Sequence, residues 1–284
     1  MNAAHEPIRV RIGGRRIAVR ASDSDDAAAA RAVLKAFDDD VSPEPPDLAI
    51  TMVRTPTGLW TVGPGDAVTH QSATRDGALL SLEFLLVSDV LARTDRFHLH
   101  GAALVDPAGA MVVLILGESG AGKTTLTLSL MGGGFRPLAD DVILLDPETL
   151  CPDRFPRSFH VDDRTRRLID PLFAGREWET PGLPPGYCLP LSWAEASRPV
   201  GAVVLPAGHG YVEPLLTRLS PADTAMALLS GTTSLDRVPR LALRTAARIA
   251  AAAPCFTLRA GTPADNVDLV SQAVRGLLPS RSPA

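Results

Sequence analysis

The sequence predicts an α/β fold that contains a phosphate-binding loop and is preceded by a small α+β module. The main observation is a strand, loop and helix pattern around the residues GESGAGKT at 117–124. Along the rest of the chain, apolar strand-like segments alternate with helix-like ones, which is typical of a sheet with flanking helices. The 284 residues are enough for two domains, which we place at 1–95 and 96–278, with a disordered tail over 279–284.

The first third has the pattern of a small α+β domain. Residues 8–20 alternate around Gly13 and Gly14, which is the signature of a β-hairpin. This part contains no recognisable catalytic constellation, so we expect it to serve substrate binding. Its other expected elements are a helix over 25–37, strands over 48–54 and 59–62, and a helix over 75–93.

The second part is expected to alternate strands and helices. The prolines of residues 180–190 remove backbone donors and predict an irregular loop. Ser192, Ser220 and Thr262 each resemble the first residue of a helix, because an acid follows three positions later. The expected strands cover 97–105, 112–116, 137–146, 201–206 and 255–260.

The glycine-rich loop has the residue types that phosphate binding requires. Glycines let backbone N–H groups turn toward phosphate oxygens, and the N-terminus of the following helix favours negative charge. Lys123 is one of only two lysines in the chain, and a compact ammonium fits between phosphates where a guanidinium does not. The hydroxyl of Thr124 is expected to bind Mg²⁺. The expected nucleotide-binding residues are Gly117, Glu118, Ser119, Gly120, Ala121, Gly122, Lys123, Thr124 and Thr125.

Composition argues against several classes of partner. The net charge of −4 and the isoelectric point near 5.9 leave no polybasic footprint, so we expect neither nucleic acid nor a membrane as partner. The three cysteines are far apart and form no metal or disulfide pattern, which suits a reducing cytoplasm. Residues 1–20 are charged and polar and predict no signal peptide, and the apolar segment 79–91 is too short to span a bilayer. We therefore expect a cytoplasmic protein.

Three stretches of the chain resemble one enzyme family. HGAALV at 100–105, GESGAGKTTL at 117–126 and LADDVILL at 138–145 are similar to the catalytic domain of HPr kinase/phosphorylase. The resemblance covers residues 97–146 well, the C-terminal third only in element order, and the first 95 residues hardly at all. It implies a mixed sheet with flanking helices, ATP and Mg²⁺ as cofactors, and transfer of the γ-phosphate to a serine hydroxyl. Related kinases of peptide natural-product pathways, including lasso peptide pathways, phosphorylate a precursor peptide, and family members form oligomers.

Kinase chemistry requires a base or orienting acid for the acceptor hydroxyl, a second magnesium ligand, and donors for the charge on the transferred group. The resemblance assigns the first two of these roles to Asp140 and Asp141 and leaves open which residue takes which role. Asp141 is our first choice for the metal ligand, and Asp140 is the alternative. Adjacent strand residues point to opposite faces, so both reach one site only if the strand has not fully begun there. Asp146 competes with the pair, because an acid after four apolar residues fits the usual Walker B pattern.

The resemblance also assigns a histidine. The family has a histidine before glycine at its active site, which implies that His100 hydrogen-bonds the γ-phosphate or the acid pair, while His98 packs. The family's E-x-R-G run after the acid pair is missing here. The corresponding stretch, DRFPRSFHVD at 153–162, offers Arg157 and Arg154 for transition-state charge. This departure argues against the carrier protein as substrate and against phosphorolysis, and it leaves ATP binding and phosphoryl transfer in place.

The sequence thus predicts an ATP- and Mg²⁺-dependent kinase that phosphorylates serine on a peptide or small protein. The alternative functions are a small-molecule hydroxyl kinase and an ATPase-type regulatory module. GTP is an alternative nucleotide, and each of the three functions is compatible with a homo-oligomer. A deep pocket beside the loop would favour the first alternative, and switch-like loops without an acceptor site would favour the second. The expected catalytic residues are His100, Lys123, Asp140, Asp141 and Arg157.

Overall fold

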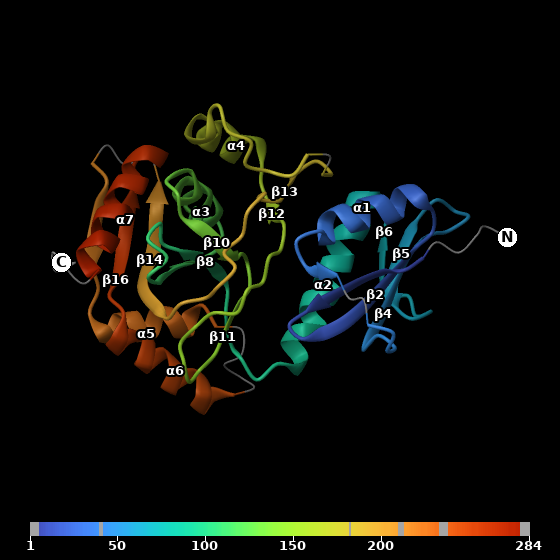
Figure 1. Ribbon diagram of the computed structural model, residues 1–284, viewed down its shortest axis with the longest axis horizontal. Helices are drawn as coiled ribbons and strands as arrows, with labels where there is room; N and C mark the ends of the chain where they lie inside the picture. The colour runs from blue at the N-terminus through green and yellow to red at the C-terminus, as the bar shows by residue number, and fades with distance from the viewer. Residues whose placement is uncertain (1–5, 40–41, 182, 210–212, 233–237, 279–284) are drawn as a thin grey trace. The chain divides into compact units, whose positions relative to one another are not determined.

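The chain forms two compact units, each with its own sheet (Figure 1). The computed structural model describes residues 6–39, 42–181, 183–209, 213–232 and 238–278. The first unit comprises Met1–Asp95 and Thr180–Leu189, and the second comprises Arg96–Glu179 and Pro190–Ala284. Thr180–Leu189, expected in the second domain, is grouped with the first unit instead. The tail predicted to be disordered lies outside the described residues.

The first unit is a six-stranded sheet packed against two helices. The helices contact each other and the sheet, and Ile17, Ile50 and Leu79 are among the fully buried side chains between them. The predicted hairpin is confirmed, and Gly13 and Gly14 take φ angles of 56° and 78° at its turn. The strands β1 (Ile8–Ile12), β2 (Arg15–Ala21), β3 (Asp38–Asp39), β4 (Leu48–Arg54), β5 (Trp60–Pro64) and β6 (His70–Ser72) pair in the order β3-β1-β2-β4-β5-β6, and the helices are α1 (Ser24–Leu34) and α2 (Arg75–Arg93).

The second unit is built on a mixed six-stranded sheet of the order β10-β8-β9-β14-β16-β15. Strands β9, β14 and β16 are parallel to one another, and the other neighbours are antiparallel. Strands β7 and β11 form a separate pair. The strands are β7 (Phe97–Leu99), β8 (Gly101–Val105), β9 (Val112–Leu116), β10 (Arg136–Ala139), β11 (Ile143–Leu145), β12 (Phe159–His160), β14 (Val200–His209), β15 (Leu215–Arg218) and β16 (Cys255–Ala260); β13 (Tyr187–Cys188) lies in the segment grouped with the first unit.

Helices pack against this sheet in two groups (Figure 1). Helix α3 contacts α7 and the strands β8, β9 and β10, whereas α5 and α6 pack together and α6 contacts β14 and β7. None of the helices in the described part of the chain is long and apolar enough to cross a membrane. The helices are α3 (Lys123–Gly132), α4 (Asp163–Ile169), a 3₁₀ helix (Asp170–Phe173), α5 (Pro221–Ser230), α6 (Pro239–Ala252) and α7 (Pro263–Leu277).

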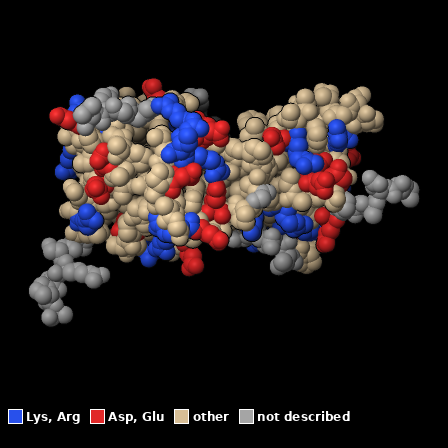
Figure 2. All heavy atoms as spheres, turned by 90° about the horizontal axis from the view of Figure 1, so that it is seen from above, with Lys and Arg blue, Asp and Glu red and all other residues tan. Residues whose placement is uncertain are grey.

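Two of the three predicted helix starts are confirmed. The side chains of Ser220 and Thr262 cap α5 and α7, and α7 has a complete capping box. The third prediction is wrong, because no helix begins at Ser192. There the N–H of Ala194 donates to the carbonyl oxygen of Pro137 at 2.8 Å, so tertiary pairing replaces the local cap. Figure 2 shows acidic and basic side chains close together on the face that it draws, in keeping with the small net charge of −4.

Candidate active site

The glycine-rich loop joins the end of β9 to the first turn of α3. Gly117, Gly120 and Gly122 take φ angles of 145°, 79° and 94°, where other residues are strained. Lys123 is the first residue of α3, and its Nζ donates to the carbonyl oxygens of Gly117 and Glu118 at 2.9 and 3.0 Å. The lysine side chain therefore lies across its own loop. Of the other expected nucleotide-binding residues, Ser119 is exposed, and Ala121, Thr124 and Thr125 are half-buried.

The predicted strand 97–105 is broken at His100, directly beside this loop. β8 begins at Gly101, which pairs with Leu116 at the end of β9. A Cβ on Gly101 would lie 2.3 Å from the carbonyl oxygen of Ile115, so glycine is required there. The N–H of His100 leaves the sheet and donates to the carbonyl oxygen of Gly231 at 2.8 Å. His100 is thereby fixed next to the end of β9.

The predicted strand 137–146 is broken next to the same point. β10 ends at Ala139, and the N–H of Val142 donates to the carbonyl oxygen of Asp140 at 2.7 Å, which closes a three-residue turn. Asp141, in the middle of this turn, takes a φ of 64°, a left-handed conformation that aspartate tolerates better than most residues. The acid pair therefore lies outside the strands and is free of their alternation, as a shared site requires.

The two carboxyl groups lie in opposite environments. Asp140 is only 8% exposed, and burial, together with the negative charge of Asp141, raises its pKa to about 7. The side chain of Asp141 is 44% exposed, and its hydrogen bond with His100, together with the charge of Arg157, lowers its pKa to about 2. At neutral pH Asp141 is ionised and Asp140 is close to the midpoint of its titration.

His100 and Lys123 belong to the same cluster as the acid pair. Nδ1 of His100 lies 3.1 Å from Oδ1 of Asp141 and 3.0 Å from its carbonyl oxygen, and the hydrogen bond to Asp141 raises the pKa of His100. Burial lowers the pKa of Lys123, and the charges of Asp141 and Asp140 oppose this effect. His98, in contrast, is buried within β7, in line with the packing role expected for it.

Arg157 reaches the acid pair because its segment runs beside β10. Phe155 forms a parallel bridge with Ala139, so the residues two positions further on, Arg157 and Asp141, also lie side by side. Nη1 of Arg157 donates to Oδ2 of Asp141. The Arg157 side chain is only 12% exposed, whereas that of Asp141 is 44% exposed, so solvent screens the pair only from the side of Asp141. Arg154, the other arginine considered for this role, is exposed.

His160 is a member of this cluster that the sequence did not predict. Its Nε2 lies 3.5 Å from Nη2 of Arg157, and a positive charge on its ring acts to lower the pKa of Asp140. The preceding residue, Phe159, is fully buried and stacks on Trp193 with ring centroids 6.0 Å apart, which fixes the backbone at this point. In the sequence, His160 is only a histidine three positions after an arginine, and nothing there indicates that it lies near the acids.

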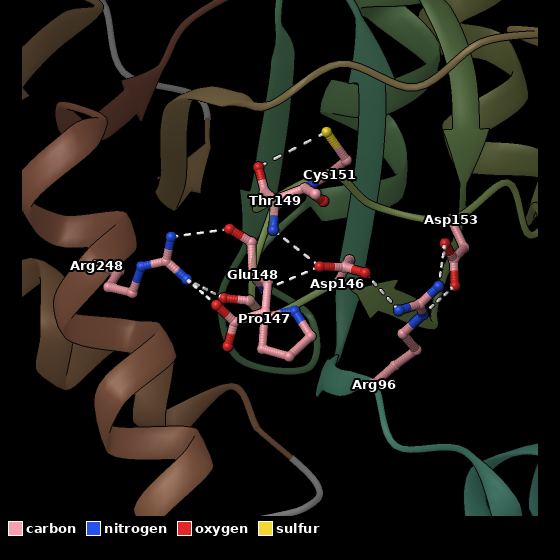
Figure 3. Close-up of polar contacts among 8 residues, drawn as sticks. All are labelled: Arg96, Asp146, Pro147, Glu148, Thr149, Cys151, Asp153 and Arg248. Atoms are coloured by element: carbon pink, nitrogen blue, oxygen red, sulfur yellow. Dashed lines mark hydrogen bonds and ion pairs between the residues drawn. The ribbon is translucent and has the colours of Figure 1, made fainter.

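Asp146 has a structural role instead of a place in this cluster. Figure 3 shows its carboxylate accepting hydrogen bonds from the N–H groups of Glu148 and Thr149, both at 2.8 Å, and from Nη1 of Arg96 at 2.6 Å. Arg96 also binds Asp153 at 2.7 Å, so it joins both ends of the turn after β11. The carboxylate oxygens of Asp146 are therefore engaged in holding a turn, which weakens the Walker B alternative.

The donor set fits a nucleotide with Mg²⁺. Within the described ranges, no group of three or more His, Cys, Asp or Glu side chains could hold a metal ion by itself. Mg²⁺ at phosphoryl-transfer sites does not need such a group, because it keeps several waters and binds one or two carboxylates together with phosphate oxygens. The ionised carboxylate of Asp141 and the hydroxyl of Thr124 are oxygen donors of this kind.

Comparisons with known proteins add little to this geometry. No protein-family model matches the chain, and no curated protein matches it. The solved structure of the Hpr(Ser) kinase/phosphatase from Coxiella burnetii is similar, with a TM-score of 0.33 and 17% sequence identity, over 63% of this chain and 94% of that chain. A TM-score this low does not establish a shared fold. The assignment of function therefore depends on the site residues themselves.

Proposed function

We propose that this chain is an ATP- and Mg²⁺-dependent phosphotransferase that passes the γ-phosphate to a serine hydroxyl of a peptide or small protein. One observation carries the proposal: a carboxyl group with a pKa of about 7, Asp140, lies next to the ionised Asp141 and close to the lysine that begins α3. Phosphoryl transfer to a hydroxyl needs a proton acceptor, a metal ligand and a cation for the phosphates in one place.

The environment of each acid decides its role in the proposal. Asp140 is the general base, because a carboxylate with a pKa near 7 can accept a hydroxyl proton at neutral pH. Asp141 is the metal ligand together with Thr124, because it stays ionised and is partly exposed. The bound Mg²⁺ would neutralise charge on the phosphate oxygens.

The cationic residues act on the phosphate groups. Lys123 binds the β- and γ-phosphates, and for this its Nζ exchanges the two loop carbonyls for phosphate oxygens. Arg157 and His100 donate to the negative charge that develops on the transferred group, and both hold Asp141 in place until then. The backbone N–H groups of the glycine-rich loop, 117–122, enclose the remaining phosphate oxygens.

The identity of the acceptor has separate support. Serine and a peptide are what the resemblance of residues 97–146 implies. We extend the proposal to the first unit, which we assign to binding the acceptor peptide. The grouping of Thr180–Leu189 with residues 1–95 supports this assignment, because it adds a proline-containing segment to a unit for which the sequence suggests no chemistry of its own.

Transfer of labelled phosphate tests the proposal. The protein is incubated with γ-labelled ATP and Mg²⁺, with and without serine-containing peptides, and any phosphate is mapped by mass spectrometry. We expect labelled peptide and slow hydrolysis without acceptor, because a base placed for a hydroxyl needs that hydroxyl to complete the site. Fast hydrolysis without labelled peptide would instead support the ATPase-type module. Labelled GTP in a parallel reaction identifies the nucleotide.

A further inference from the structure

We propose that His160 is a positioning residue that holds the guanidinium of Arg157 against Asp141. The inference deepens the proposed function and rests on it for its catalytic consequence. The observation behind it is that Arg157 contacts acceptors on two segments of the second unit, among them Oδ2 of Asp141 after β10 and Nε2 of His160 in β12 at 3.5 Å.

Acceptors on two separate segments restrict the plane of a guanidinium more than an acceptor on one segment does. Arg157 uses Nη1 for Asp141 and Nη2 for His160, and these two nitrogens are fixed relative to each other in the planar group. His160 can accept only when Nε2 carries no proton, which requires the neutral ring with its proton on Nδ1. In that tautomer the contact orients Arg157 through Nη2, while Asp141 holds Nη1.

The position of His160 suits this role better than a packing role. Its backbone is held by the buried Phe159, while its own side chain is exposed. Replacing the imidazole therefore removes the contact with Arg157 and leaves the surrounding core in place.

The second acceptor matters most when the site is loaded. Asp141 is the proposed ligand of Mg²⁺, and a carboxylate that binds the metal attracts Arg157 less strongly. His160 is then a partner that helps to keep the guanidinium within the cluster, where it serves the transferred phosphate. The expected effect of losing His160 is thus on turnover and not on nucleotide affinity.

Kinetics of paired variants test the inference. His160→Ala should lower kcat about tenfold and leave the KM for ATP within about twofold, while Arg157→Ala lowers kcat about a hundredfold. His160→Gln should recover most of the lost turnover, because its amide oxygen can accept the same hydrogen bond. The double variant should be no slower than Arg157→Ala. Additive losses, or no rescue by glutamine, would overturn the inference.

A second measurement separates this inference from the proposed function. Thermal unfolding of the same variants in EDTA, without nucleotide, reports the coupling of the two side chains and needs no activity. Arg157→Ala should lower Tm by about 2 °C or more, and adding His160→Ala should lower it no further. Arg164→Ala, an exposed arginine of α4, is the matched control and should leave Tm unchanged. If the Tm shifts of the two single variants add up in the double variant, the coupling of His160 and Arg157 is refuted, even if the protein proves to be a kinase. If the Tm shifts are coupled but no phosphoryl transfer is found, only the proposed kinase activity is refuted.

Discussion

At the scale of single residues, Asp140 and Asp141 show how adjacent identical side chains acquire opposite properties. The turn that Asp141 makes with positive φ buries the first carboxyl group and directs the second toward His100 and Arg157. Burial then raises one pKa to about 7, and the hydrogen bond and positive charge lower the other to about 2. A pair of acids with separated pKa values is what general base and metal ligand roles require.

The first prediction concerns the stability of Asp140→Asn without metal. The folded pKa of Asp140, about 7, lies above the ordinary value of 3.8, so the folded state keeps a proton that the unfolded chain loses. The resulting stability is fully present below pH 3.8 and is lost as pH rises to about 7. Asparagine resembles the protonated form and avoids this loss. In EDTA at pH 8.5 the variant should therefore unfold about 5 °C higher than the original protein.

The pH dependence provides the control for this prediction. The advantage of Asp140→Asn should shrink toward pH 4, where the aspartate is protonated in both states, and turnover should be absent at every pH. Circular dichroism melts at pH 4, 6 and 8.5 measure the first effect. A variant that is less stable than the original protein at pH 8.5 would contradict the burial argument.

Lys123→Ala is predicted to cut phosphoryl transfer by about a thousandfold or more, because a charge aimed at the transferring group is lost. The same change removes the cation proposed to bind the β- and γ-phosphates, so nucleotide binding should weaken as well. The chain offers an unusually clean control, since Lys35 is the only other lysine and is exposed. Lys35→Ala should keep full activity, and more than a tenth of the original activity in Lys123→Ala would exclude the phosphate-binding role.

At the scale of elements, the sequence predicted turns and helix caps that depend on neighbouring residues, but it did not predict the breaks in two strands. The hairpin at Gly13 and Gly14 and the capping box at Thr262 follow from residues within one turn, and both are confirmed. The strand breaks at His100 and at Asp140–Val142 depend on pairing with other strands, which the sequence does not display. The candidate residues themselves were named from the sequence, except His160, whose proximity arises from tertiary packing.

The break before β8 gives a testable consequence. Gly101→Ala places a methyl group 2.3 Å from the carbonyl oxygen of Ile115, so β8 and β9 must separate, at a cost of about 2 kcal/mol or more. Gly276→Ala near the end of α7 meets no atom within 4 Å and should stabilise the protein by up to about 0.5 kcal/mol. Chemical denaturation of both variants measures the difference, and equal effects would show that the strand end is not tightly fixed.

The turn after β11 separates the two candidate metal acids. Asp146→Asn loses the ion pair with Arg96, but its amide oxygen can still accept from the N–H groups of Glu148 and Thr149. We expect turnover within about twofold of the original and a small fall in Tm. Asp141→Asn should abolish turnover. Steady-state kinetics of both variants measure this difference. An inactive Asp146→Asn together with an active Asp141→Asn would show that Asp146 is the functional acid, as the Walker B pattern predicts.

At the scale of the whole molecule, the candidate active site lies within the second unit. A fragment of residues 96–284 contains all of its residues and should still bind ATP. It lacks most of the first unit, so peptide phosphorylation should fall by at least about tenfold if that unit binds the acceptor. Residues 180–189, deprived of the rest of their unit, should become sensitive to proteases. Undiminished peptide phosphorylation by the fragment would remove the first unit from substrate binding.

The division of the first unit into two stretches of sequence affects the order in which the protein forms on the ribosome. Domains generally fold as they emerge, with the N-terminal one first. Here the last piece of the first unit, Thr180–Leu189, is synthesised only after 96–179, which belongs to the second unit. The sheet and both helices of the first unit lie within residues 8–93, so only this last segment must wait until 96–179 has been translated. A premature stop before residue 189 removes part of this segment from the first unit and all of 190–284 from the second.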